Sequence, residues 1–201
     1  MIYTKHRTIF IHIPKTGGSS IGRALKPHRD LKTVLIRRAN KTLKSMRLSY
    51  RVNSINEGGH PSAIEHREVL GDEYFNYFSF SIVSNPFDWT LSYYNYFHRR
   101  NTPEPLSFQE YLKVMPPKPQ SEYILDARGN IMVSYVGRFE TINEDFRAIS
   151  RKMHLNAELP HVNSIKNLNL NTGHNKETRK LVQEKYQLDF KIFNYSMDLY
   201  I

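Results

Sequence analysis

Residues 8–20 read TIFIHIPKTGGSS, and this stretch decides the fold. Its first part, Thr8–Ile13, is mostly β-branched or aromatic, which is typical of a buried strand. Pro14 ends the strand, Gly17-Gly18-Ser19-Ser20 opens a short helix, and Pro27 stops that helix. A strand, a glycine turn and a helix in this order indicate the start of an α/β unit.

The same turn predicts an anion-binding site. A helix N-terminus presents free backbone N–H groups, glycines let the backbone approach a ligand, and hydroxyls and Lys15 supply further donors. The loop is not a Walker A loop, in which the lysine follows the glycines, and no G-x-G-x-x-G motif occurs. A tight turn with a surface lysine is the plainer alternative, and the unbroken run of donors after Lys15 argues against it.

Two further apolar segments extend this unit. Phe78–Val83 is predicted to be a second buried strand and Ile131–Phe139 a third. Ser84-Asn85-Pro86 suits the start of a helix at about Phe87–Arg99, because Ser or Asn can cap it and Pro fits its first turn. Other helices are expected at 34–51, 63–70, 107–113, 143–154 and 176–186. Strands that alternate with helices indicate an α/β fold with a parallel sheet, and 201 residues suit a single domain over 1–201.

The net charge of +10 is concentrated near the N-terminus. Residues 1–60 hold 13 basic and two acidic residues, whereas 61–201 hold 16 basic and 17 acidic ones. The predicted helix at 34–51 carries an apolar stripe and a basic remainder without a single acid. This pattern leaves two readings open, a solvated helix face and a contact surface for an anionic partner.

Composition excludes several classes of protein. The chain has no cysteine, which rules out disulfides, cysteine zinc sites and thiol nucleophiles and fits a reducing compartment. The longest uncharged run, Tyr74–Phe87, is shorter than the about 20 apolar residues that cross a bilayer. We therefore expect a soluble, unprocessed, cytoplasmic protein without integral membrane segments. No metal site is expected, because the spacing of His60, Glu65 and His66 fits no strong ligand pattern.

Together these motifs resemble the P-loop-like sulfotransferases, and most closely the branch with glycan 2-O-sulfotransferases and small bacterial relatives. The loop at 12–20 resembles the family's 5′-phosphosulfate loop, and residues 83–92 resemble its 3′-phosphate motif. Further matches follow in family order at 59–60, 135–140, 145–146, 159–163 and 186–195. The resemblance implies a three-layer domain with a central, mostly parallel sheet flanked by helices.

The resemblance also implies a donor and a set of roles. The donor would be 3′-phosphoadenosine 5′-phosphosulfate (PAPS), used without a metal. Lys15 would contact the oxygen between phosphate and sulfur, and Ser92 the 3′-phosphate, although an ordinary helical serine is the alternative there. The residues expected to hold the 5′-phosphate are Thr16, Gly17, Gly18, Ser19 and Ser20.

His60 corresponds to the histidine that serves as general base in the 2-O-sulfotransferase branch, and an imidazole pKa of about 6.5 suits that task. A loop-capping histidine is the alternative, with Glu57 and Glu65 as reserve bases. One departure concerns Ser84, which stands where the family has an arginine. One possibility is that Ser84 holds the 3′-phosphate together with a basic residue from elsewhere, which could be Arg23, Arg99, Arg100 or a member of 37–51. Otherwise the 3′-phosphate is recognised more weakly, or the donor has no 3′-phosphate.

The sequence thus favours a sulfotransferase that acts on a hydroxyl of a carbohydrate-like or small-molecule acceptor, which could be an anionic glycan. A catalytically weak nucleotide- or glycan-binding protein remains an alternative, and a P-loop kinase a less favoured one. A nucleic-acid partner is not expected, because no DNA- or RNA-binding motif occurs. The loops at 102–120 and 159–175, the second expected to be mobile, would set acceptor specificity.

Overall fold

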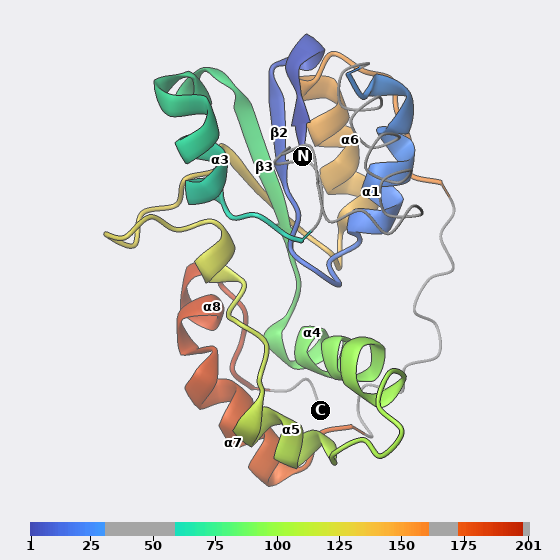
Figure 1. Ribbon diagram of the computed structural model, residues 1–201, viewed down its shortest axis with the longest axis vertical. Coiled ribbons are helices and arrows are strands. Elements are labelled where there is room, and N and C mark those ends of the chain that lie inside the picture. Colours follow the sequence, from blue (N-terminus) through green and yellow to red (C-terminus); the bar gives the residue numbers. More distant parts are fainter. Residues whose placement is uncertain (31–58, 161–172, 199–201) are drawn as a thin grey trace, which may run out of the picture.

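The computed structural model describes residues 1–30, 59–160 and 173–198, so the predicted basic helix at 34–51 and most of the predicted loop at 159–175 lie outside the described residues. Its centre is a four-stranded sheet in the order β1-β2-β3-β4 (Figure 1). The strands are β1 (Ile2–Tyr3), β2 (Thr8–Ile11), β3 (Phe78–Val83) and β4 (Tyr135–Arg138). β2, β3 and β4 are parallel, and β1 pairs antiparallel with β2 at the edge.

The third predicted strand was too long. Only Tyr135–Arg138 pairs with β3, whereas Ile131 forms an isolated bridge with Leu125. The reason is a tight turn before β4, in which the Asp126 carboxylate accepts hydrogen bonds from the backbone N–H groups of Arg128 and Asn130. β1 was not predicted, because a strand of two residues carries no periodicity.

Helices cover both faces of the sheet, which confirms the predicted three-layer α/β architecture. α1 (Gly18–Ala24) and α6 (Ile142–Lys152) lie on one face, and α3 (Ala63–Leu70) lies on the other (Figure 1). Alternate strand residues point to opposite faces. Phe10, Phe80 and Ile82 accordingly pack into the cluster with α1 and α6, while Ile9 and Ile11 pack into the cluster with α3.

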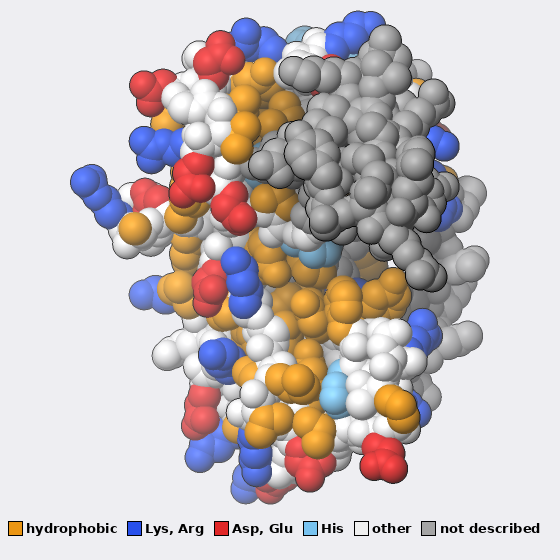
Figure 2. Space-filling model, viewed as in Figure 1, with side chains coloured by type: hydrophobic (Ala, Val, Ile, Leu, Met, Phe, Trp, Pro, Cys, Tyr) orange, Lys and Arg blue, Asp and Glu red, His pale blue; other side chains and the backbone are white. Residues whose placement is uncertain are grey.

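A second group of helices lies beyond the carboxyl ends of the parallel strands (Figure 1). Its members are α4 (Pro86–Tyr93), a π-helical segment η4 (Tyr94–Arg99), α5 (Phe108–Val114), α7 (Lys176–Lys185) and α8 (Gln187–Ile192). Short 3₁₀ segments are η1 (Thr4–His6), η2 (Lys26–His28), η3 (Gly71–Asn76) and η5 (Ser121–Tyr123). On the face in Figure 2, hydrophobic side chains gather where these helices meet the sheet. Within the described ranges, no helix combines the length and the apolar character that a membrane crossing needs.

A buried carboxylate ties the last helix to the centre of the molecule. The side chain of Asp189 in α8 is fully buried and accepts hydrogen bonds from the backbone N–H groups of Gln120 (2.8 Å) and Ser121 (2.9 Å). The amide side chain of Gln120 in turn pairs with both backbone polar groups of Ser84, at 2.8 and 2.9 Å. The C-terminal helix therefore fixes the loop that holds the end of β3.

Replacing Asp189 with alanine should lower the free energy of unfolding by about 3 kcal/mol, because two buried N–H groups lose their acceptor. Denaturant unfolding of the full chain measures this change. Asp198→Ala is the matched control, since Asp198 is exposed and its loss should cost under about 0.5 kcal/mol. Equal effects of the two substitutions would contradict a structural role for the Asp189 contacts.

Candidate functional site

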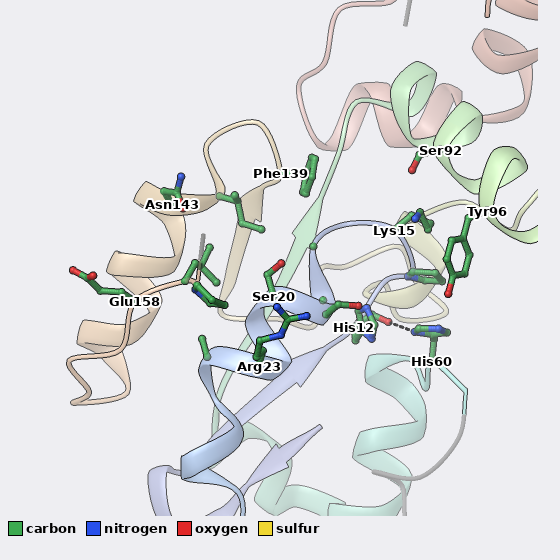
Figure 3. Close-up of a pocket in the computed structure, with 18 of the residues that line it drawn as sticks. His12, Lys15, Ser20, Arg23, His60, Ser92, Tyr96, Phe139, Asn143 and Glu158 are labelled. Atoms are coloured by element: carbon green, nitrogen blue, oxygen red, sulfur yellow. Dashed lines mark hydrogen bonds between the residues drawn. The ribbon is translucent and has the colours of Figure 1, made fainter. Parts of the chain in front are cut away.

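A cavity of about 1140 Å³ lies at the carboxyl edge of the sheet (Figure 3). Its wall combines the loop after β2, the first turn of α1, His60 before α3, Ser92 in α4, residues of η4 and the start of α6. Its size exceeds the roughly 300–1,000 Å³ of most ligand pockets. Parallel strands end at one edge of a sheet, which explains why segments so far apart in sequence meet here.

The loop after β2 is closed by its own polar groups. The buried Thr16 hydroxyl donates to the Ile13 carbonyl (2.9 Å), and the indole N–H of Trp89 donates to the Pro14 carbonyl (2.8 Å). Lys15 and Gly17 both have left-handed backbone conformations, with φ of 66° and 83°. These constraints turn the chain sharply from β2 into α1 and point the Lys15 side chain along the cavity wall.

Both glycines of this loop are needed for packing inside the protein. A Cβ atom on Gly17 would lie 2.4 Å from Cδ1 of Ile142 in α6, and one on Gly18 would lie 1.8 Å from Nε2 of His12. The sequence pattern predicts glycines that let a ligand approach the backbone closely. In the structure they first allow the loop to approach α6 and the imidazole of His12.

Lys15 lies in an aromatic and electropositive setting. Its Nζ lies 4.2 Å from the ring centroid of Tyr96 in η4, which is a cation–π contact. Burial lowers the pKa of Lys15 below its usual value, and the neighbouring charge of Arg100 lowers it further. The ammonium is therefore partly desolvated and repelled, a condition that an anionic ligand would relieve.

His60 lies beside His12 on the same wall (Figure 3). Its Nδ1 is 3.1 Å from the His12 carbonyl oxygen, and the two rings meet edge to face with centroids 4.5 Å apart. Burial lowers the pKa of His60, although its hydrogen bond to His12 opposes the shift. The pKa of His12 falls to about 3 through burial and the proximity of His60. Both imidazoles are thus neutral at neutral pH.

The cavity brings together most of the residues that the sequence pointed to. Those on the wall are Lys15, Gly17, Gly18, Ser19, Ser20, His60 and Ser92. Thr16 and Ser84 are not among the wall residues: Thr16 closes the loop, and the buried hydroxyl of Ser84 donates to Oε1 of Glu140 (3.1 Å). The reserve base Glu65 instead caps α3 through Ser62, and Glu57 lies outside the described residues.

Most other wall residues were not predicted, whereas Arg23 is one of the basic residues that the sequence offered for the 3′-phosphate. Arg23, Arg147 and Glu158 supply the charged groups besides Lys15, so cations outnumber carboxylates on the described wall. Further wall residues include His12, Tyr96, Phe97, Phe139, Ile142 and Asn143. Only the position of His12, at the end of a predicted strand and next to the glycine loop, could have identified it.

Within 1–30, 59–160 and 173–198, no cluster of three or more histidine, aspartate or glutamate side chains is arranged to hold a metal ion. The described wall itself presents cations, hydroxyls, backbone N–H groups and a neutral imidazole. This chemistry suits binding of a phosphorylated ligand and removal of a proton close to it.

The neutral side chains of the half-buried His12 and the buried His66 should make stability depend on pH. Burial lowers the pKa of His12 to about 3 and that of His66 to about 4, whereas an unfolded histidine titrates near 6.5. The contribution of these two histidines to the free energy of unfolding is fully present above pH 6.5. It is lost as the pH falls toward 4, because the unfolded chain then binds more protons than the folded protein.

Denaturant midpoints between pH 7 and 4.5 measure this dependence. His66→Gln should make the decline shallower than in the wild type, since it removes one of the differentially protonated groups. An unchanged slope in this variant would show that His66 is not neutral in the folded protein.

Comparison with known proteins agrees with this chemistry. The model of the sulfotransferase family matches residues 1–196 of the chain. Comparison with curated proteins found no match. Comparison with solved structures found none either.

Proposed function

Because the chain belongs to the sulfotransferase family, we propose that it transfers the sulfuryl group of PAPS to a hydroxyl of a carbohydrate-like or small-molecule acceptor. The observation that carries this proposal is the shared cavity wall of the glycine loop, Lys15 and His60. An anion cradle, a cation and a neutral imidazole are the parts that in-line transfer between two oxygens requires.

The donor would bind along the loop after β2. Backbone N–H groups of Gly17, Gly18 and Ser19 and the hydroxyls of Ser19 and Ser20 would hold the 5′-phosphate, and the closed turn around Thr16 would keep them in place. Phe139 and Ile142 offer an apolar wall that suits a purine ring. Arg23 and Lys15 would balance part of the donor's negative charge.

In the proposed reaction, the acceptor oxygen attacks sulfur as the bond between sulfur and the bridging phosphate oxygen breaks. The electron pair of that bond passes to the phosphate oxygen, where the Lys15 ammonium would stabilise the developing charge. His60 would take the acceptor's proton. Its lowered pKa, caused by burial, keeps it unprotonated and available as a base at neutral pH.

His60→Ala should lower kcat for sulfuryl transfer by about 10²–10⁴-fold, the usual contribution of a general base, with donor affinity retained. Radiolabelled transfer from PAPS and calorimetry with 3′-phosphoadenosine 5′-phosphate measure the two quantities. His154→Ala is the matched control, because it removes an exposed imidazole. Near-normal turnover in His60→Ala would exclude His60 as the base.

Recognition of the 3′-phosphate is the least conventional part of the proposed site. Ser92 lies on the cavity wall, whereas the hydroxyl of Ser84 is engaged by Glu140. Of the candidate arginines, Arg23 lies on the cavity wall. Burial is the main cause of the lowered pKa of Lys15, and Arg100 lies close enough to Lys15 to lower that pKa further. We propose that Ser92 and Arg23 hold this phosphate in place of the family's arginine.

The chain should bind 3′-phosphoadenosine 5′-phosphate roughly 10-fold or more tightly than adenosine 5′-phosphate, because hydrogen bonds to a charged group contribute about 1.5–3 kcal/mol. Ser92→Ala and Arg23→Ala should each narrow this ratio, and Ser84→Ala should not. Calorimetry with both nucleotides measures it. Equal affinities in the wild type would remove the 3′-phosphate site.

The acceptor would enter beside Tyr96 and Phe97. Both rings are partly exposed, at 47% and 40%, and both lie on the wall that holds Lys15 and His60. Exposed aromatic faces suit a sugar ring or another flat acceptor, and the excess of cations on the wall suits an anionic one.

A further inference from the structure

We propose that His12 is the positioning residue of the catalytic base: its backbone carbonyl fixes the tautomer of His60, and its imidazole fixes the orientation of the His60 ring. The inference rests on the proposed role of His60 as base, and it adds a second histidine with a separate task.

The hydrogen bond decides the tautomer. A carbonyl oxygen can only accept, so the 3.1 Å contact between His60 Nδ1 and the His12 oxygen requires a proton on Nδ1. The lone pair of a neutral His60 is then on Nε2. A histidine free in water favours the opposite tautomer, with the proton on Nε2, so this contact selects the form whose Nε2 can accept a proton.

The ring of His12 is itself held on three sides. It lies 5.5 Å from the ring of Phe10 and 4.5 Å, edge to face, from the ring of His60. On the third side is Gly18, where a Cβ atom would fall 1.8 Å from His12 Nε2. Any side chain at position 18 would therefore displace the imidazole that supports His60.

This arrangement links the base to the phosphate loop. Gly18 is the first residue of α1 and lies on the wall where the donor's phosphate would bind. The segment from His12 to Gly18 thus contributes both the cradle and the support of His60. One turn of the chain would therefore position both the donor, through the phosphate cradle, and the acceptor, through the base His60.

This tautomer of His60 provides an acceptor for the proton that the hydroxyl of the acceptor molecule must lose. The acceptor's O–H proton moves to Nε2 of His60 as its oxygen bonds to sulfur, and the resulting imidazolium keeps its Nδ1–H on the His12 carbonyl. Of the titratable side chains on the described wall, His12 contacts the ring of His60 and Tyr96 from η4 points toward it (Figure 3); Lys15, Arg23, Arg147 and Glu158 line the same cavity. The carbonyl of His12 faces the new positive charge directly, and its negative end stabilises that charge.

The tautomer can be tested without any activity. Long-range ¹⁵N–¹H correlation spectra of the ¹⁵N-labelled full chain at pH 7.5, with His60 assigned through His60→Gln, should show a protonated Nδ1 and an unprotonated Nε2. The opposite tautomer, or exchange between both, would overturn the inference even if His60 proved to be the base. Loss of turnover in His60→Ala together with the expected tautomer would support both statements.

The role of the ring is tested by His12→Asn, which retains the backbone carbonyl. Removing the ring exposes His60 to water, so we expect the acid limb of the kcat profile at saturating donor to move to higher pH, and kcat to fall roughly 10-fold or more. The KM for the donor should change much less. His154→Asn is the matched control and should leave the profile unchanged, because that imidazole is exposed and Asn tolerates its left-handed φ of 55°.

Gly18→Ala gives an independent check, because it displaces the ring of His12 while keeping both histidines. It should shift the acid limb in the same direction as His12→Asn. A fall in kcat with an unmoved acid limb in both variants would overturn the proposal, since a purely structural defect lowers the rate without changing the pKa of the base. Should either variant fail to fold, the spectra of the wild type still decide the tautomer.

Discussion

Parallel pairing of β2, β3 and β4 brings three strand ends to one edge of the sheet, and the geometry of the site depends on this alignment. The register places Ile11 beside Ser81 and Val83 beside Arg138. The chain that leaves each strand must therefore turn within the same small space. That crowding explains why the loop after β2 contains two adjacent glycines: each occupies a position where a Cβ atom would overlap a neighbouring side chain.

The same alignment separates what the sequence could predict from what it could not. The strand at 8–11, the turn and the first helix follow from β-branched residues, Pro14 and the glycines, all of which act locally. The contacts of Ser84 could not be predicted from local sequence, because its partner Glu140 lies 56 residues away and is brought near by the pairing of β3 with β4. Tyr96 could not be assigned to Lys15 for the same reason.

The surroundings of Ser84 suggest why a small neutral residue is stable there. The Glu140 carboxylate accepts hydrogen bonds from the Ser84 hydroxyl, the Asn85 backbone N–H and the Tyr195 hydroxyl, all of them neutral donors. Nearby, burial raises the pKa of Asp88, and the charge of Glu140 raises it further. The end of β3 is thus a satisfied polar network, linked through Gln120 to the buried Asp189. Such networks are stabilising only when each member has a partner, and both the hydroxyl and the backbone polar groups of Ser84 have one.

The opposite holds on the described part of the cavity wall, where cations outnumber carboxylates. Lys15 is partly desolvated, lies near Arg100 and shares the wall with Arg23 and Arg147, against the carboxylate of Glu158. Its contact with the Tyr96 ring offsets only part of this cost, because a cation–π contact contributes about 0.5–2 kcal/mol. A multiply charged anion would remove the repulsion and replace the lost hydration of Lys15 in one step. The turn is closed by the Thr16 hydroxyl and packed around its two glycines, so it holds the backbone of Lys15 in place before such a ligand arrives, and less binding energy is spent on ordering it.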